Sequence, residues 1–166
     1  DGNTSAGNYD IFLAKYNSNG NKQWTQQLGT SGSDSAEGVA TDSSGNVYVT
    51  GGTSGGLDGN NAGGRDLFVV KYNSSGTKQW TKQLGSSGRD SANGITIDSS
   101  GNIYVTGLTF GGLDWNTSAG ANDLFVVKYN SSGTKQWTEQ LGSASSDVAN
   151  GVATDSSGNV YVAGVT

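Results

Sequence analysis

Hydrophobic residues occur along the chain in short runs of strand length, separated by clusters of Ser, Gly and Asn. The run LFVVKY is apolar on both faces, with Phe68, Val70 and Tyr72 on one side and Leu67 and Val69 on the other, which predicts a sheet covered on both sides. The turns SSGN and SSGT use Gly, which takes φ > 0 without steric cost. One copy of the pattern predicts four strands, at Glu37–Asp42, Val47–Thr53, Asp66–Asn73 and Lys78–Gly85.

The pattern is repeated three times. Trp24, Trp80 and Trp137 are spaced 56 and 57 residues apart. Residues 66–86 and 123–143 differ at a single position, Lys82 against Glu139. Internal repeats of this kind indicate one supersecondary unit per copy.

Four antiparallel strands per copy, buried on both faces and repeated in tandem, are typical of β-propeller blades. The small residues of GVATD suit the innermost strand, where blades crowd the axis, and Trp80 and Leu84 suit the wedge between blades. A β-solenoid is the alternative, but its coils are usually shorter than about 57 residues. We therefore predict an all-β chain, a β-propeller of four-stranded antiparallel blades.

The phase of the repeat divides the chain into three blade-equivalents. Residues 37–92 and 93–149 form two blades, while 1–36 supply the outer two strands of a split blade and 150–166 the inner two. Three blades do not close a ring, because propellers have about 4–8. Either the chain is part of a longer array, a mature or excised piece, or chains associate. We favour closure by oligomerisation, as a homodimer of six blades; a homotrimer would give nine.

The residues DLFVVKYNSSGTKQWTKQLGSSGRDSANGITIDSSGNIYVTG resemble the bacterial beta-propeller repeat family known as SBBP. A weaker likeness to NHL repeats lies in GITIDSSGNIYVTG. The SBBP resemblance covers nearly the whole chain and implies four-stranded blades in bacterial, often surface-associated, proteins. It implies no reaction, because fold alone does not supply one.

Composition narrows the function classes. The net charge of −5 and the nine scattered Lys and Arg residues argue against a nucleic-acid partner. No apolar run reaches the roughly 20 residues that span a bilayer, so we expect no membrane insertion. The chain has no Cys, and its Asn, Ser, Thr and Gly-rich, Lys-poor composition favours an extracellular or cell-surface setting.

The chain lacks several of the side chains on which catalysis most often depends. The absence of His and Cys removes imidazole acid–base catalysis and thiolate nucleophiles. Every Asp residue stands at one of four positions that recur in each copy of the repeat, and we call each set of equivalent residues a column. Because the members of a column have equivalent environments, the columns offer no acid pair with two different environments. We predict that the protein is not an enzyme.

Two Asp columns have structural interpretations. Asp42 and its counterparts Asp98 and Asp155 begin the turn DSSGN, where the carboxylate accepts backbone N–H groups. Asp34 and its counterparts precede the first strand of each blade and are expected to cap a loop in the same way.

The other two Asp columns lie in the long loop between the second and third strands. Asp-x-Asn followed by glycines and a later Asp offers several oxygens on a pliable loop, which suits Ca²⁺. Hydrogen bonding within the loop is the alternative, and otherwise we expect no cofactor. The candidate Ca²⁺ ligands are Asp1, Asn3, Asp10, Asp58, Asn60, Asp66, Asp114, Asn116 and Asp123.

In propellers this loop and the one joining successive blades emerge on the same face, and the copies differ most here. Aromatic side chains beside amides and charges suit a small polar ligand such as a sugar, although loops also vary because they tolerate change. The candidate ligand-binding residues are Tyr9, Asn60, Arg65, Arg89, Phe110, Trp115 and Asn116.

We therefore predict a non-enzymatic scaffold or interaction module of a bacterial surface or secreted protein that associates with itself through its split blades and binds another protein. The alternative is a propeller lectin that binds glycans.

Overall fold

The computed structural model describes residues 4–166, which form twelve strands and one short 3-10 helix. No helix in this range is long and apolar enough to cross a bilayer. The elements are β1 (Ile11–Tyr16), β2 (Lys22–Leu28), β3 (Asp34–Thr41), β4 (Val47–Thr53), β5 (Asp66–Tyr72), β6 (Lys78–Leu84), β7 (Asp90–Ile97), β8 (Ile103–Thr109), η1 (Leu113–Trp115), β9 (Asp123–Tyr129), β10 (Lys135–Leu141), β11 (Val148–Thr154) and β12 (Val160–Val165).

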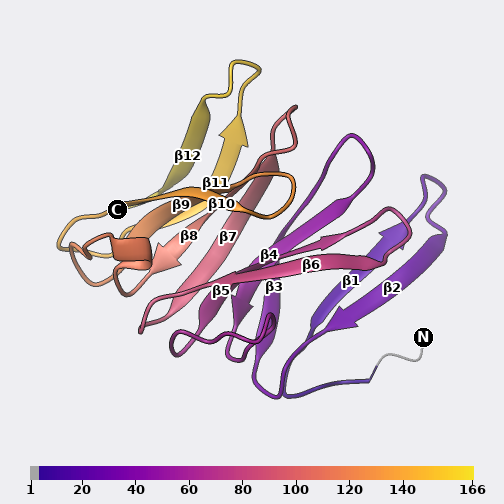
Figure 1. Cartoon of the computed structure of the whole chain (residues 1–166), viewed down its shortest axis with the longest axis horizontal. Coiled ribbons are helices and arrows are strands. Elements are labelled where there is room, and N and C mark those ends of the chain that lie inside the picture. The colour runs from indigo at the N-terminus through magenta and orange to yellow at the C-terminus, as the bar shows by residue number, and fades with distance from the viewer. Residues whose placement is uncertain (1–3) are drawn as a thin grey trace.

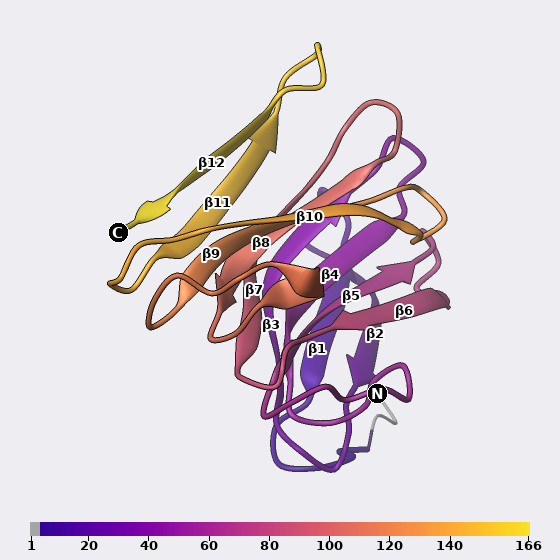
Figure 2. The ribbon, with the colours of Figure 1, turned by 60° about the vertical axis from the view of Figure 1, so that its left-hand side comes forward.

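The strands form two complete antiparallel sheets and two half sheets. The complete sheets have the orders β3-β4-β5-β6 and β7-β8-β9-β10, and the half sheets pair β1 with β2 and β11 with β12. The sheets spread like a fan, with the two half sheets at its opposite ends (Figures 1 and 2). Each complete sheet is an up-and-down antiparallel blade, which confirms the propeller prediction and excludes the parallel coils of a solenoid.

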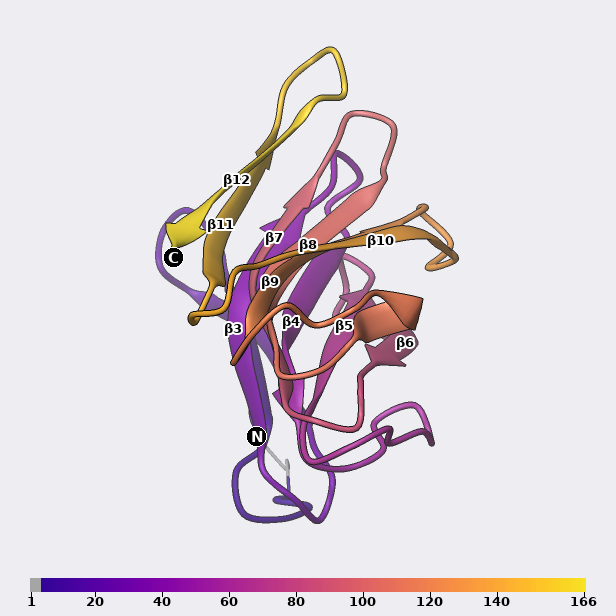
Figure 3. The same cartoon turned by 90° about the vertical axis from the view of Figure 1, so that its left-hand side faces the viewer.

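The inner strand β7 contacts β3 on one side and β11 on the other along the axis of the fan, with β6 and β10 on the far side (Figure 3). Close approach is allowed by glycine. A Cβ on Gly94 of β7 would lie 3.3 Å from the Asn150 carbonyl oxygen and from the Gly151 Cα of β11. The predicted position of GVATD on the innermost strand is therefore confirmed.

Both faces of the third strand are buried, as LFVVKY predicts. Leu67 and Val69 pack in a cluster with the β7–β10 sheet, which includes Phe125. Phe68 and Val70 pack in a second cluster with the β1–β2 half sheet. Each blade is thus held by apolar side chains on both sides, the main favourable term in its stability.

The inner strands begin a few residues before the predicted starts at residues 37, 93 and 150. β3 begins at Asp34, where residues 34–36 already pair with β4. The register then shifts between Ala36 and Gly38, so Glu37 is the extra residue of a β-bulge. The bulge interrupts the hydrophobic pattern and hides the earlier start from a reading of periodicity.

A buried aspartate opens β3 and β7 and joins them to the preceding blade. Asp90 accepts hydrogen bonds from the Ser86 backbone N–H at 2.6 Å and from the Ser86 hydroxyl. The Thr109 hydroxyl, at the end of β8, donates to its other oxygen. Asp34 repeats the arrangement with Thr30 and Thr53, which confirms the predicted cap.

We expect Thr109→Val to destabilise the fold by about 1–3 kcal/mol, because it removes one donor from a carboxylate that is fully buried. Thr81→Val is the matched control, since the buried Thr81 hydroxyl has no hydrogen-bond partner, and we expect it to be neutral or stabilising. Urea unfolding of both variants measures the difference. Equal losses would contradict the assigned role of Thr109.

Candidate functional site

The variable loops meet at one end of the fan. Short parallel bridges join the loop that precedes the third strand to the loop that links successive blades: Tyr9 to Ser33, Arg65 to Arg89, and Asn122 to Ser146. The two loops therefore lie side by side, as expected for a common face. Arg65, Arg89 and Phe110 come together here, because the Phe110 N–H donates to the Arg89 carbonyl at 2.9 Å.

Arg65 is the half-buried member of this group. Its guanidinium lies against the Cα of Gly52 and donates to the Ser35 hydroxyl. Burial, together with the nearby charge of Arg89, lowers the pKa of Arg65. Glu37 and Asp34 are also near and act in the opposite direction. The two arginines thus lie beside two acids and the half-exposed Phe110.

The remaining aromatic and amide candidates lie apart from this group. Tyr9 precedes β1 at the repeat position of Arg65, where it bridges Ser33, and its side chain is exposed. Asn116 donates to the Thr138 carbonyl of the outer strand β10, so the segment around η1 lies over the outer edge of its blade. Trp115 is fully exposed there, and both it and Asp114 have positive φ, which is strained for residues other than glycine. The structure therefore does not gather these candidates at one point.

The candidate metal ligand Asp66 is bonded to neutral donors. One of its oxygens accepts the Ala62 N–H and the Gln83 side-chain amide, both at 2.8 Å. The other oxygen is buried without a hydrogen-bond partner and lies against the Cα of Gly85. Asp10 and Asp123 repeat the arrangement with their own Gln and Gly residues.

The glutamine column is the part of this arrangement that sequence reasoning missed. Gln83 also accepts the Leu57 N–H at 2.8 Å and donates to the Gly55 carbonyl, so it ties the long loop to the outer strand. Gln27 and Gln140 stand at the same repeat position. Their recurrence in every copy was the available signal.

The second acidic column is also bonded within the protein. Asp58 accepts the Gln83 backbone N–H and the Asn60 N–H, both at 3.0 Å, and Asp114 pairs with Lys135. Within residues 4–166, no three acidic side chains gather where a metal ion could sit. Asp1 and Asn3 lie outside the described residues. Calcium binding therefore stays a prediction. Hydrogen bonding within the loops accounts for the candidate carboxylates described above.

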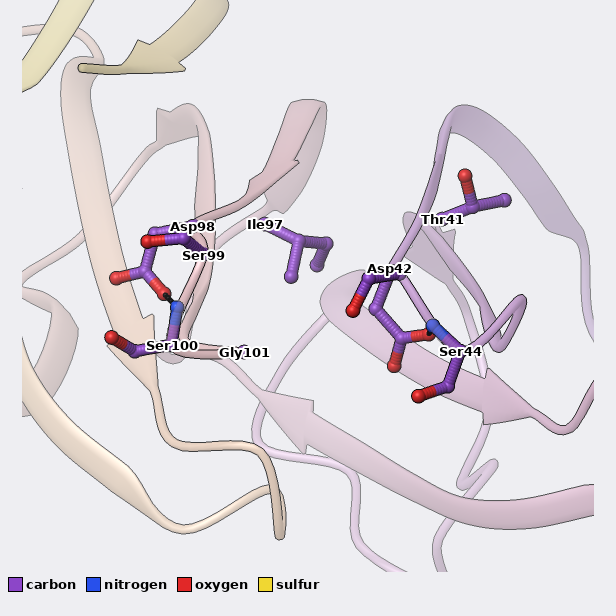
Figure 4. Close-up of a pocket in the computed structure, with 9 residues that line it drawn as sticks. Thr41, Asp42, Ser44, Ile97, Asp98, Ser99, Ser100 and Gly101 are labelled. Atoms are coloured by element: carbon purple, nitrogen blue, oxygen red, sulfur yellow. Dashed lines mark hydrogen bonds between the residues drawn. The ribbon is translucent and has the colours of Figure 1, made fainter. Parts of the chain in front are cut away.

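A polar cavity of about 470 Å³ lies at the opposite end of the fan, between the hairpin turns that follow β3 and β7. Ile97 lies between the two turns, with Asp42 and Asp98 on either side (Figure 4). Each carboxylate is held in its own turn: Asp98 accepts the N–H groups of Ser100 and Asn102, the Asn102 amide and the Tyr104 hydroxyl. The turn interpretation of this column is confirmed.

These hydrogen bonds favour the charged carboxylates. Burial alone would raise the pKa of Asp98, but the donors from Asn102 and Tyr104 outweigh it and lower the pKa. In the exposed counterpart Asp155, the bonds from Asn159 come first and bring the pKa to about 2. The carboxylates of the DSSGN turns are therefore suited to hold their turns, and few of their lone pairs are left to bind a ligand.

The repeat model described as Beta-propeller repeat, SBBP, matches residues 23–58, 79–114 and 136–166. The chain belongs to the SBBP beta-propeller repeat family. This confirms the resemblance stated from the sequence.

Two relatives are similar over most of the chain. An uncharacterized WD repeat-containing protein L264 of Acanthamoeba polyphaga mimivirus is 30% identical over 88% of the chain, and the regulatory protein FlaEY of Caulobacter vibrioides is 28% identical over 75%. The matches cover only 13% and 15% of those proteins. The SBBP chain thus corresponds to a small part of each relative.

We expect acid to destabilise the SBBP fold through the DSSGN turns. Their carboxylates have folded pKa values below 3.8, the ordinary value of an aspartate, so their stabilisation is complete above that pH and is lost as the pH falls toward about 2. Urea unfolding at pH 5 and pH 2.5 should show the loss, and Asp98→Asn should reduce it. Glu139→Gln, on exposed β10, is the control and should keep the full loss. An unchanged loss in Asp98→Asn would contradict this assignment.

Proposed function

We propose that the chain is a non-enzymatic interaction scaffold of a bacterial surface or secreted protein, which associates with itself through its split blades. Two chains complete a ring of six blades and present the variable loops on one face, where another protein binds. Three chains completing nine blades are the larger alternative. The Asn-, Ser-, Thr- and Gly-rich, Lys-poor composition supports the external location.

The observation that carries the proposal is the placement of exposed hydrophobic side chains. Among residues 4–166, eight of the eleven large ones lie on the two end half sheets or on the strands that face them: Phe12, Tyr16, Val39, Trp137, Leu141, Tyr161, Val162 and Val165. Several of them adjoin in the grooves beside β1 and β12, and exposed apolar patches mark interaction sites. Within the described chain, β1 and β12 each also keep one unpaired edge, which is a template for another strand.

The arrangement of carboxylates supports a role without catalysis. Asp66 and Asp90 are buried and bonded to backbone N–H, hydroxyl and amide groups. The DSSGN carboxylates are bonded in the same manner. A general acid or base needs a proton-transfer path to a substrate and a pKa near the working pH, and carboxylates of the DSSGN column have lowered pKa values instead.

Light scattering tests self-association directly. We expect a mass of two chains, constant across protein concentrations, because both ends of the fan are then covered. A mass of three chains would replace the six-bladed ring by a nine-bladed one. A single-chain mass at every concentration would overturn the self-association of this chain.

A propeller lectin is the second candidate, and the Arg65–Arg89 pair beside Phe110 favours it. Two guanidinium groups bind a carboxylate or sulfate, and an aromatic ring stacks on a sugar face. We expect binding to acidic rather than neutral glycans on a glycan array. Arg89→Ala should abolish this binding, because Arg89 is exposed and its guanidinium is available to a ligand. Lys78→Ala, at the turn end of β6, is the control. No binding at high micromolar glycan would eliminate the lectin.

A further inference from the structure

The two open edges of the fan belong to strands that are partners in the complete blades. In residues 4–166, β1 pairs only with β2 and β12 only with β11. Their counterparts β5 and β4 pair with each other in the first complete sheet, and β9 and β8 do so in the second. The half sheets lie at opposite ends of the fan, so one chain does not bring them together (Figure 2).

Side chains on these strands are exposed where their repeat counterparts are buried. Phe12 of β1 is 64% exposed, whereas Phe68 and Phe125 are 0% exposed. Tyr161 of β12 is 58% exposed, whereas Tyr48 is 0% exposed. Each half sheet therefore lacks the neighbouring strands that bury the equivalent side chains in a complete blade, and the other half sheet has strands of that kind.

Phe12 has a matching groove at the far end. Phe125 packs with Leu67 and Leu84 of the preceding blade. The next step of the repeat places Phe12 against Leu124 and Leu141, which line an apolar groove of about 280 Å³ together with Val162, Gly164, Val165 and Thr166. A second groove of about 400 Å³ runs between β1 and the inner strands β3 and β4, where the missing inner strands of the β1–β2 blade would lie.

The outer turns show the same relation. A Cβ on Gly76 would lie 2.9 Å from the ring of Trp24, and one on Gly133 would lie 3.1 Å from the ring of Trp80. Trp137 continues this series and is 36% exposed. Gly20, the corresponding glycine of the β1–β2 turn, has nothing within 4 Å of a Cβ position. Trp137 therefore lacks a glycine turn to pack on, and Gly20 lacks a tryptophan ring. If two copies meet, Gly20 of one copy can supply the turn for Trp137 of the other.

The end strands also differ from the complete blades in a compensating way. Thr50 lies opposite Val69, and Thr106 lies opposite Val126. The corresponding positions of the end strands are Ala163 and Leu13. Ala163 lacks the hydroxyl and methyl groups of Thr, while Leu13 has one methylene more than Val. Directly opposite residues of a sheet are in side-chain contact, so a small residue faces a large one if the two ends meet.

We infer that β12 of one copy pairs antiparallel with β1 of a second copy of this chain in the register of β4 and β5, with Ala163 opposite Leu13 and Phe12 in the Leu124–Leu141 groove. This rests on the proposed self-association and adds its register and its specificity. Because the complete blades use Thr opposite Val, the Ala–Leu pair distinguishes the seam between copies from the pairings inside a chain. A strand with Val at the Leu13 position fills this seam less well.

Disulfide trapping tests the register, since the chain has no other Cys. We expect the double variant Leu13→Cys with Ala163→Cys to form a covalent two-chain species on mild oxidation. Ala14→Cys with Ala163→Cys is the control, because neighbouring residues point to opposite faces of a strand and the substitution leaves Phe12 in place, and it should cross-link far less. Light scattering of the unsubstituted chain is run in parallel.

The outcomes separate the register from the association itself. A two-chain mass with equal or preferential cross-linking of the control pair, or with none in either pair, overturns the register and leaves self-association in place. A single-chain mass overturns both. Cross-linked species longer than two chains support the β12–β1 register and overturn the two-chain ring.

A double-mutant cycle tests the Ala–Leu pair. Ala163→Thr crowds Leu13, and Leu13→Val leaves a gap beside Ala163, so each single variant should weaken association by about tenfold or more. The double variant restores the Thr–Val pair of the complete blades and should recover affinity near that of the parent chain. Additive losses would overturn the pairing of these two residues. Cross-linking would then show whether another strand of the same protein, rather than β1, covers β12.

Discussion

The spacing of the blades depends on the buried aspartate at the start of the inner strand. Asp90 is the meeting point of three segments: the loop that leaves β6, the start of β7 and the end of β8. Burial raises the pKa of Asp90, so its environment penalises the charge that the surrounding donors must satisfy. This bonding pattern is specific to one position of the loop, and it therefore sets where one blade ends and the next begins.

Apart from Asp114, which pairs with Lys135, the carboxylates described above are bonded to neutral donors. The bonds to Asp66 and Asp98 come from amides, hydroxyls and backbone N–H groups, and Lys or Arg takes no part in them. Neutral donors hold a carboxylate at fixed geometry and are not screened by salt as surface ion pairs are. The low Lys and Arg content is thus compatible with a well-bonded interior, and the carboxylate columns are parts of the architecture.

The local features of the fold could be predicted from the sequence because each has a local cause. The alternation in LFVVKY identifies a strand buried on both faces, and Gly101, at φ 80°, identifies a hairpin turn. Two hydrogen bonds could not be predicted from the sequence: the one between Gln83 and Asp66 and the one between Thr109 and Asp90. Their partners are 17 and 19 residues apart and meet only in the folded sheet. The positive φ of Trp115 gave no signal either, since Trp does not favour that conformation, whereas Asp114 beside it tolerates it.

The tandem repeat has a consequence for how such proteins change size. Each complete sheet is built from one continuous segment, such as the one that spans β3 to β6, and packs on its neighbours through side chains at equivalent positions. Duplication or loss of one such segment therefore keeps the packing between neighbouring blades. The number of blades can then change in a single genetic step without any new contact having to evolve.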